Sequence, residues 1–393
     1  MRRSTLAALL GLTIVLGLIG AWLVIDRVQT TAADLSGRPL LPDLKAGLNS
    51  VSTVTLTGAE GSFTLKRQTG DRWTMPERGD YPVDFGKVQR LLLALAEMKA
   101  IEPKTARPDR YPFLDVQDVG PGTRSLRLTV RNAGGEPLAD IIIGKPSDVM
   151  GAAKVPRQFV RLAGEAGSWE AEADLRLERA PATWLDRELL VIAPDRFRAA
   201  SVTRDGQTVR ISRAKPGEAF TLDGLDAATS NPKTGRIGAL AVAATYLTLE
   251  DVQKAGAAGK PLGTVRYETF DGLVVTLDLV TLDGQGWAGI AAAFDPALAE
   301  AGKIDNPPQG PDGQPLLKDA EAVKAEVGAL TARTAGWLYR LDGTRVIDLT
   351  PEAKDLSEPK PAPGAAPAAP PMSPAMPPGF PGGMPFPLPP GGQ

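Results

Sequence analysis

The sequence predicts an α+β protein with three parts: an N-terminal transmembrane helix, two similar units that each combine a β-sheet with a helix, and a disordered proline-rich tail. Three observations support this prediction. Residues 4–25 carry no charged side chain. A pattern of strands and one helix recurs after roughly 147 residues. Residues 359–393 are rich in proline. The total length of 393 residues suits two to three domains.

The N-terminal segment is expected to anchor the protein in a membrane. Arg2 and Arg3 precede residues 4–25, and at about 1.5 Å per residue a helix of that length spans the roughly 30 Å hydrocarbon core. A cleaved signal peptide is the alternative, although its apolar region is usually only about 7–15 residues long. The positive-inside rule puts the N-terminus in the cytoplasm. We therefore expect residues 1–28 to be a single-pass anchor in a bacterial inner membrane, with a periplasmic body.

The first unit is expected over residues 51–190, after an extended stalk over residues 29–50. Apolar residues alternate with polar ones around Val54 and Leu65, which predicts a β-hairpin. Asp84 precedes a leucine-rich helix and is placed to cap its free backbone N–H groups. Further strands are expected between this helix and the end of the unit.

The second unit, over residues 191–350, is expected to repeat the same order of elements. A hairpin comes first, and Thr234 is placed as the cap of a second helix. A further meander is followed by a helix over residues 316–330 and by a strand and turn over residues 337–349. Sequence identity between the two units is low, so the predicted internal repeat rests on the order of the elements.

The C-terminal tail is expected to be disordered or polyproline-like over residues 351–393. Lys360 is the only charged residue from position 359 onward. Such a segment buries too little apolar surface to offset the entropy lost on ordering. A passive extension is the simplest interpretation of this composition.

The composition excludes several classes of function. The chain has no histidine and no cysteine, which rules out Ser-His-Asp and Cys-His catalysis and Cys-ligated metals. The net charge is −2, from 44 basic and 46 acidic residues, without the basic surplus of a nucleic-acid-binding protein. We therefore expect no enzyme activity, no catalytic or metal-binding residues and no nucleic-acid partner. A carboxylate-dependent hydrolase stays open as a minor alternative.

A glycine motif in the second unit resembles a dinucleotide-binding fingerprint. Residues 284–289 have the spacing G-x-G-x-x-G, which normally lies between a buried parallel strand and a helix. The preceding strand alternates polar and apolar residues, unlike a buried parallel strand. The following residues 290–294 fit a strand as well as a helix. We therefore expect a hairpin turn here and no cofactor.

The segment that joins the two units is the candidate for partner docking. Residues 184–190 form a short amphipathic run, and the docking candidates are Trp184, Asp186, Arg187 and Glu188. A packed linker with solvated charges is the alternative interpretation, because runs of charged residues usually face water.

These motifs, taken together, resemble the bacterial family catalogued as domain of unknown function 4340, over about residues 50–350. The resemblance is carried by five segments: Tyr81-Pro82-Val83-Asp84, Ile143-Gly144-Lys145, Phe159-Val160-Arg161, residues 184–190, and Gly336-Trp337-Leu338-Tyr339. It implies a membrane-anchored periplasmic protein, of the kind encoded beside ABC transporter permeases and gliding-motility-type auxiliary subunits. The family has no known catalytic residues, so the resemblance assigns none.

The functional hypothesis is an extracytoplasmic, non-enzymatic accessory protein that binds the permease subunits of an ABC-type export system. A cell-envelope scaffold or glycan-binding module is the alternative, in which the tail would reach the partner. The sequence names neither the transported substrate nor the oligomeric state.

Overall fold

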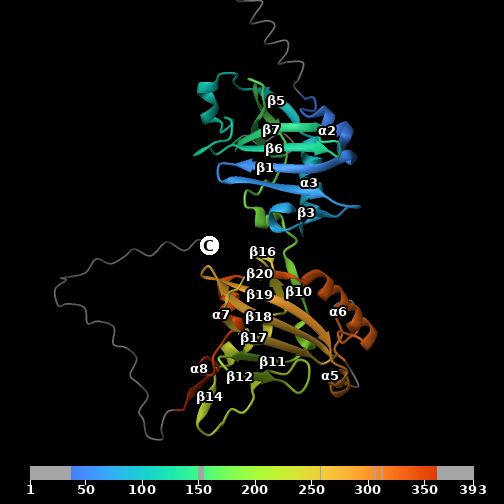
Figure 1. The fold of residues 1–393 in the computed structure, drawn as a ribbon, viewed down its shortest axis with the longest axis vertical. Helices are drawn as coiled ribbons and strands as arrows, with labels where there is room; N and C mark the ends of the chain where they lie inside the picture. The colour runs from blue at the N-terminus through green and yellow to red at the C-terminus, as the bar shows by residue number, and fades with distance from the viewer. Residues whose placement is uncertain (1–36, 149–154, 257, 305–306, 311–312, 361–393) are drawn as a thin grey trace, which may run out of the picture.

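The computed structural model describes residues 37–148, 155–256, 258–304, 307–310 and 313–360. Over this range the chain is an α+β protein built mainly from β-sheets, as predicted. Two units follow one another along the long axis, the first coloured blue to green and the second yellow-green to red (Figure 1). Among the described residues, no helix is both long and apolar enough to cross a membrane. The predicted anchor and the tail beyond residue 360 lie outside the described residues.

The first unit is built around a nine-stranded antiparallel sheet in the order β4-β3-β2-β1-β6-β7-β8-β9-β5. Helix α3 (Phe85–Ala96) packs into the same core, and the short helix α2 (Pro42–Gly47) contacts both α3 and β7. The strands are β1 (Val51–Gly58), β2 (Gly61–Arg67), β3 (Trp73–Met75), β4 (Tyr81–Pro82), β5 (Lys99–Pro103), β6 (Leu126–Asn132), β7 (Pro137–Pro146), β8 (Arg157–Leu162) and β9 (Ser168–Glu172).

The predicted first hairpin is confirmed, and its side chains explain the register. Val54 pairs with Leu65 and Leu56 pairs with Phe63, and all four side chains are buried on one face of the sheet. Alternate residues of a strand point to the same face, so the alternation in the sequence places these apolar side chains together.

Helix α3 begins where the sequence predicts. The carboxylate of Asp84 accepts a hydrogen bond from the backbone N–H of Lys87, which satisfies one free donor of the first turn. The residues on its buried face recur at helical spacing: Val88, Leu91, Leu92, Leu95 and Ala96.

The second unit is built around an eight-stranded antiparallel sheet in the order β13-β12-β11-β17-β18-β19-β20-β16. Helix α4 (Thr234–Val242) contacts β11, while α6 (Ala320–Thr334) and α7 (Gly343–Leu349) contact β19. A short helix, α5 (Pro296–Ala301), follows β19. The strands are β11 (Phe197–Arg204), β12 (Gln207–Ser212), β13 (Thr221–Leu222), β16 (Asp251–Lys254), β17 (Lys260–Thr269), β18 (Leu273–Leu282), β19 (Gln285–Phe294) and β20 (Trp337–Arg340).

The strand orders of the two sheets correspond position by position. The first unit has the order β3-β2-β1-β6-β7-β8-β9-β5, and the second unit has the matching order β13-β12-β11-β17-β18-β19-β20-β16. In both units the helix, α3 or α4, lies in the chain between the initial hairpin and the edge strand that follows it, β5 or β16. The units therefore share one connectivity within the described residues.

The expected stalk is wrong for the part that the structure describes. Residues 42–47 form α2, whose Leu44 is fully buried in the core of the first unit. The backbone N–H of Leu40 donates to the carbonyl of Met98 at 2.9 Å. This segment folds because Leu40, Leu41 and Leu44 supply an apolar face that the polar residues around them obscure in the sequence.

Two domain boundaries also differ from the prediction. Residues 353–356 form α8, and β21 (Ser357–Pro359) pairs with β14 (Ser230–Pro232), so the fold extends beyond residue 350. Leu356 is fully buried there. At the other boundary, β10 (Glu188–Val191) pairs with β15 (Tyr246–Thr248), so this strand already belongs to the second unit.

Three local expectations in the second unit are also wrong. Helix α6 begins after its cap Asp319 rather than at residue 316, because this carboxylate accepts from the backbone N–H of Ala322. Residues 343–349 form helix α7 rather than a turn, with Asp342 as its cap. Thr234 is the first residue of α4, and the N-cap position is occupied by Lys233, which makes no capping hydrogen bond.

Candidate functional site

Trp184, the first predicted docking residue, is a core residue. Its side chain is only 2% exposed, and its ring lies 6.5 Å from the ring of Phe63. The indole Nε1–H donates to the backbone carbonyl of Glu178 at 2.8 Å. Burial with a satisfied donor is the usual structural role of tryptophan. Its ring is therefore not available to a partner in this structure.

The other three candidates lie where the two units meet. The backbone N–H of Asp186 donates to the carbonyl of Pro82, and its own carbonyl accepts from the Tyr81 hydroxyl at 3.2 Å. Arg187 Nε donates to the carbonyl of Leu249 in the second unit at 2.9 Å. Arg187 and Glu188 are exposed, while Asp186 is half-buried. The candidate segment is thus chiefly a structural connection between the units.

An ion pair joins the facing edges of the two units. The guanidinium of Arg78, just before β4, binds the carboxylate of Asp251 on β16 through two hydrogen bonds of 2.6 and 3.1 Å. Such bidentate pairs fix orientation as well as contributing energy. The ammonium group of Lys254 lies 3.5 Å from the ring centroid of Trp337, so a cation–π contact accompanies the pair.

Aromatic rings also meet at the junction of the two units. Tyr81 from the first unit meets Trp337 edge-on at 5.0 Å between ring centroids, and meets Tyr339 at 6.1 Å. Burial raises the pKa of Tyr339 to about 12 and also raises the pKa of Tyr81. Burial likewise raises the pKa of Asp186. Both phenols therefore stay protonated near neutral pH, which suits packing rather than proton transfer.

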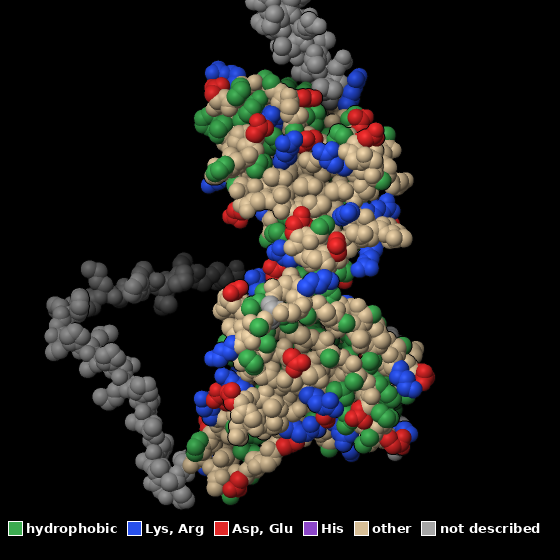
Figure 2. Space-filling view, viewed as in Figure 1, with side chains coloured by type: hydrophobic (Ala, Val, Ile, Leu, Met, Phe, Trp, Pro, Cys, Tyr) green, Lys and Arg blue, Asp and Glu red, His purple; other side chains and the backbone are tan. Residues whose placement is uncertain are grey.

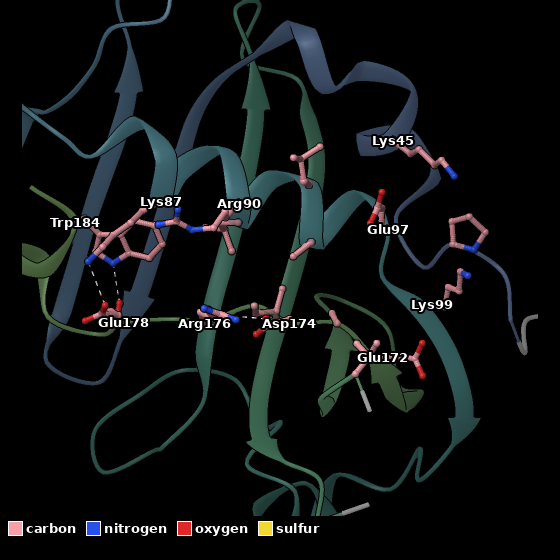
Figure 3. Close-up of a pocket in the computed structure, with 17 residues that line it drawn as sticks. Lys45, Lys87, Arg90, Glu97, Lys99, Glu172, Asp174, Arg176, Glu178 and Trp184 are labelled. Atoms are coloured by element: carbon pink, nitrogen blue, oxygen red, sulfur yellow. Dashed lines mark hydrogen bonds and ion pairs between the residues drawn. The ribbon is translucent and has the colours of Figure 1, made fainter. Parts of the chain in front are cut away.

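A groove of about 940 Å³ lies beside α3 on the first unit (Figure 3). Helix α3 forms one side, and residues 173–178, which continue from β9, form the other. Leu91 and Leu175 supply a buried apolar floor, and Leu93 on the helix is 43% exposed. Lys45 and Lys99 lie at the end opposite Trp184 (Figure 3).

Several charged groups around the groove are already paired. The ammonium group of Lys87 lies 3.2 Å from the carboxylate of Glu178 and also donates to the carbonyl of Thr183. Arg176 Nε lies 2.9 Å from the carboxylate of Asp174. The carboxylates of Glu178 and Asp174 are therefore each paired with a cation, and they do not face each other as an acid–base couple.

Other charged groups on the rim lack such partners. Within the described part of the chain, Lys45, Arg90 and Lys99 make no side-chain hydrogen bond or ion pair, and Glu97 and Glu172 make none either. Basic groups therefore outnumber acidic ones among the unpaired side chains. An apolar floor with a charged rim is suited to binding an amphipathic segment.

The sequence carries no signal for this groove. It predicted the buried face of α3, but the other side of the groove consists of residues 173–178, which belong to no regular element. Only the fold brings this segment beside the helix.

The glycine motif at residues 284–289 has a structural role. Residues 283–284 form the turn between β18 and β19, and the glycines that follow lie on β19, which pairs along its length with β18. No helix follows the glycines directly, as a dinucleotide site would require. Among the described residues, no group of three or more acidic side chains is arranged to hold a metal ion.

The surface in Figure 2 shows basic and acidic side chains interspersed over both units, with the body narrowing where the units meet. This distribution matches the near-zero net charge and provides no single electrostatic face on the side shown.

Comparison with known proteins gives one match. Residues 73–261 match the family model described as Domain of unknown function (DUF4340), a range that begins at β3 and ends within β17. This confirms the predicted family resemblance. No curated protein and no solved structure matches the chain.

Proposed function

We propose that this chain, whose residues 73–261 match the DUF4340 family model, is a membrane-anchored, extracytoplasmic accessory protein that binds the permease of an ABC-type export system. Its role is binding rather than catalysis. The absence of histidine and cysteine from the whole sequence supports this, because it removes the side chains most used for catalysis near neutral pH.

The position of the groove is the observation that carries the proposal. The backbone N–H of Gly37, the first described residue, donates to the carbonyl of Ala100 at 2.7 Å, and Pro39 pairs with Lys99 at the groove. Residues 29–36 separate this point from the proposed anchor. A chain of that length reaches at most roughly 29 Å when fully extended. The proposed anchor thus keeps the groove close to the bilayer and to the extracytoplasmic parts of a permease.

We also propose that the two units are copies of one ancestral unit. The matching strand orders and the equivalent positions of α3 and α4 support this. One copy then provides the groove, while the other extends the body away from the membrane.

Affinity purification from detergent-solubilised membranes, with the full chain at its native expression level, tests the proposed function. We expect a permease and its ATPase to be recovered with it. A matched sample carrying Val242→Asp, at an exposed site on α4 away from the groove, should recover the same partners. Recovery of neither transporter subunit would contradict the proposal.

A further inference from the structure

The first unit carries a much longer loop than the second unit at one equivalent position. The connection from β5 to β6 spans residues 104–125, whereas the equivalent connection from β16 to β17 spans only residues 255–259. Figure 1 shows this β5–β6 loop, in teal, at the end of the first unit that faces away from the second unit. Because the two units otherwise share one connectivity, the loop is an addition specific to the first unit.

Buried side chains fix the β5–β6 loop against the sheet. The hydroxyl of the buried Tyr111 donates to the carbonyl of Ala166 at 2.6 Å. The guanidinium of Arg161, which is also buried, lies 4.7 Å from the centroid of the Tyr111 ring. The same guanidinium donates to the carbonyl of Val116 at 2.9 Å and to the carboxylate of Asp118 at 2.5 Å. The loop therefore has a defined position on the body.

This fixed loop holds an apolar ring out in solvent. Phe113 is 73% exposed, the highest value among the large apolar residues that the structure describes. Three residues earlier, the exposed Arg110 makes no side-chain hydrogen bond or ion pair within the described residues, whereas Arg107 is paired with Asp109. An exposed ring beside an unpaired cation suits a membrane surface, where the ring enters the acyl boundary and the cation reaches the lipid phosphates.

The chain enters the first unit beside this loop. Pro39 forms an antiparallel bridge with Lys99, and the backbone N–H of Gly37 donates to the carbonyl of Ala100. From Pro39 back to Gly37 the backbone therefore runs along β5 in the direction of the loop. The loop begins at Lys104, roughly 13 Å beyond Ala100 at about 3.3 Å per residue. The proposed anchor thus joins the body at the end that carries the loop.

We propose that the β5–β6 loop rests on the outer surface of the lipid bilayer and inserts Phe113 into it, as a second membrane contact beside the anchor. This inference rests on the membrane anchor proposed above. Residues 29–36 allow at most roughly 29 Å between the anchor and Gly37, which keeps the loop within reach of the bilayer. Arg110 then lies among the lipid phosphates. Two contacts fix the orientation of the first unit, and with it the groove, relative to a permease.

The absence of cysteine from the sequence permits a direct test of this contact. The full chain with Phe113→Cys is labelled with a nitroxide and incorporated into nanodiscs of phosphatidylethanolamine and phosphatidylglycerol. Electron paramagnetic resonance then compares the access of oxygen and of a water-soluble nickel chelate to the label. We expect this label to lie about 5–10 Å into the boundary between headgroups and acyl chains. The matched control is Ile347→Cys on α7, a 60% exposed site in the second unit, whose label should stay in water.

A second set of variants tests whether the ring of Phe113 itself supports the contact. The label is moved to the exposed neighbouring site by Pro112→Cys, with and without Phe113→Asp. Phe113→Asp should lower the ratio of inserted to water-exposed label at least about tenfold, because burial of a phenylalanine ring is worth at least that factor. Ile347→Asp should leave the ratio unchanged. Circular dichroism melting confirms that each variant is folded, and an unchanged ratio in a folded Phe113→Asp protein would contradict the proposal.

The outcomes separate this inference from the proposed function. A water-exposed label at position 113 in chains that co-elute with the nanodiscs, or equal insertion of the labels at positions 113 and 347, would overturn the loop contact and leave the anchor in place. Failure of the chain to enter nanodiscs would overturn the anchor and the loop contact together. If the label at position 113 inserts but affinity purification recovers no transporter subunit, the permease-binding role fails and the membrane contact stands.

Discussion

The ion pair between Arg78 and Asp251 predicts a measurable energetic coupling between the two units. These residues are 173 positions apart in sequence, and two hydrogen bonds join their side chains. Substituting each with alanine, separately and together, gives a double-mutant cycle that isolates the pairwise energy from other effects of each change.

The structure sets the expected size of this coupling. The two side chains are 28% and 20% exposed, so water screens the pair only in part. At an effective dielectric constant near 20, unit charges about 4 Å apart attract by about 4 kcal/mol, and desolvation and lost side-chain freedom offset most of this. Fully exposed pairs typically measure about 0.2–1 kcal/mol. We therefore expect a coupling of about 1–1.5 kcal/mol for this bidentate, partly buried pair.

Urea unfolding of the four proteins, followed by tryptophan fluorescence, measures this energy, since Trp337 lies at the same junction, against Tyr81 of the first unit. The control is a second cycle on Arg127 and Asp140, a more exposed pair within the first sheet. Tryptic cleavage after Arg187, between the units, should accelerate in the Arg78→Ala protein and not in Arg127→Ala. A coupling energy below about 0.3 kcal/mol would refute the idea that this pair joins the units.

Two further predictions concern the first unit and its junction with the second. Leu44→Ala should destabilise the first unit by about 2–5 kcal/mol, because the fully buried Leu44 fixes α2 in the core. For a unit of this size, that loss lowers the melting temperature by roughly 5–15 °C. Substitution of the exposed neighbour, Lys45→Ala, should change the melting temperature little. A similarly small effect of Leu44→Ala would mean that α2 is not part of the core and that the segment is a stalk. Asp186→Asn should raise the melting temperature at pH 7, because burial raises the pKa of Asp186 and so penalises its charged form in the folded protein. The cost of burying the charged carboxylate is present above the raised pKa and is relieved as the pH falls through that pKa. The gain in melting temperature of Asp186→Asn should therefore shrink in acid. A gain that is independent of pH would contradict this explanation.

The sequence predicted those elements that are specified by nearby residues. The hairpin around Val54 and Leu65 follows from period-two alternation, and α3 follows from its cap Asp84 and its leucine face. The family resemblance was likewise carried by short local motifs. These features need no knowledge of distant contacts, so a single sequence is enough to find them.

The features that the sequence missed depend on contacts between distant residues. Helix α7 has only seven residues, and it is held in place by its packing on α4 and β19. Trp184 had the appearance of a surface anchor because its neighbours are charged, yet its ring enters the core formed by residues more than 100 positions earlier, such as Phe63. Local periodicity does not reveal which face of a short segment a distant sheet will cover.

The difference between the two units bears most directly on function. A helix that packs on a sheet leaves space at the side where the two meet. The second unit covers this space beside α4 with its own α7, and the ion pair between Asp348 and Arg236 joins α7 to α4. The first unit instead uses an irregular segment, residues 173–178, that forms no helix and leaves a groove beside α3, with Arg90 without a partner among the described residues. If both units were purely structural, each would gain stability by filling this space, at about 25 cal/mol per Å² of apolar surface removed from water. The first unit leaves the groove beside α3 open, close to the point where the chain leads to its proposed anchor. A docking site for a membrane partner requires an open surface in such a position.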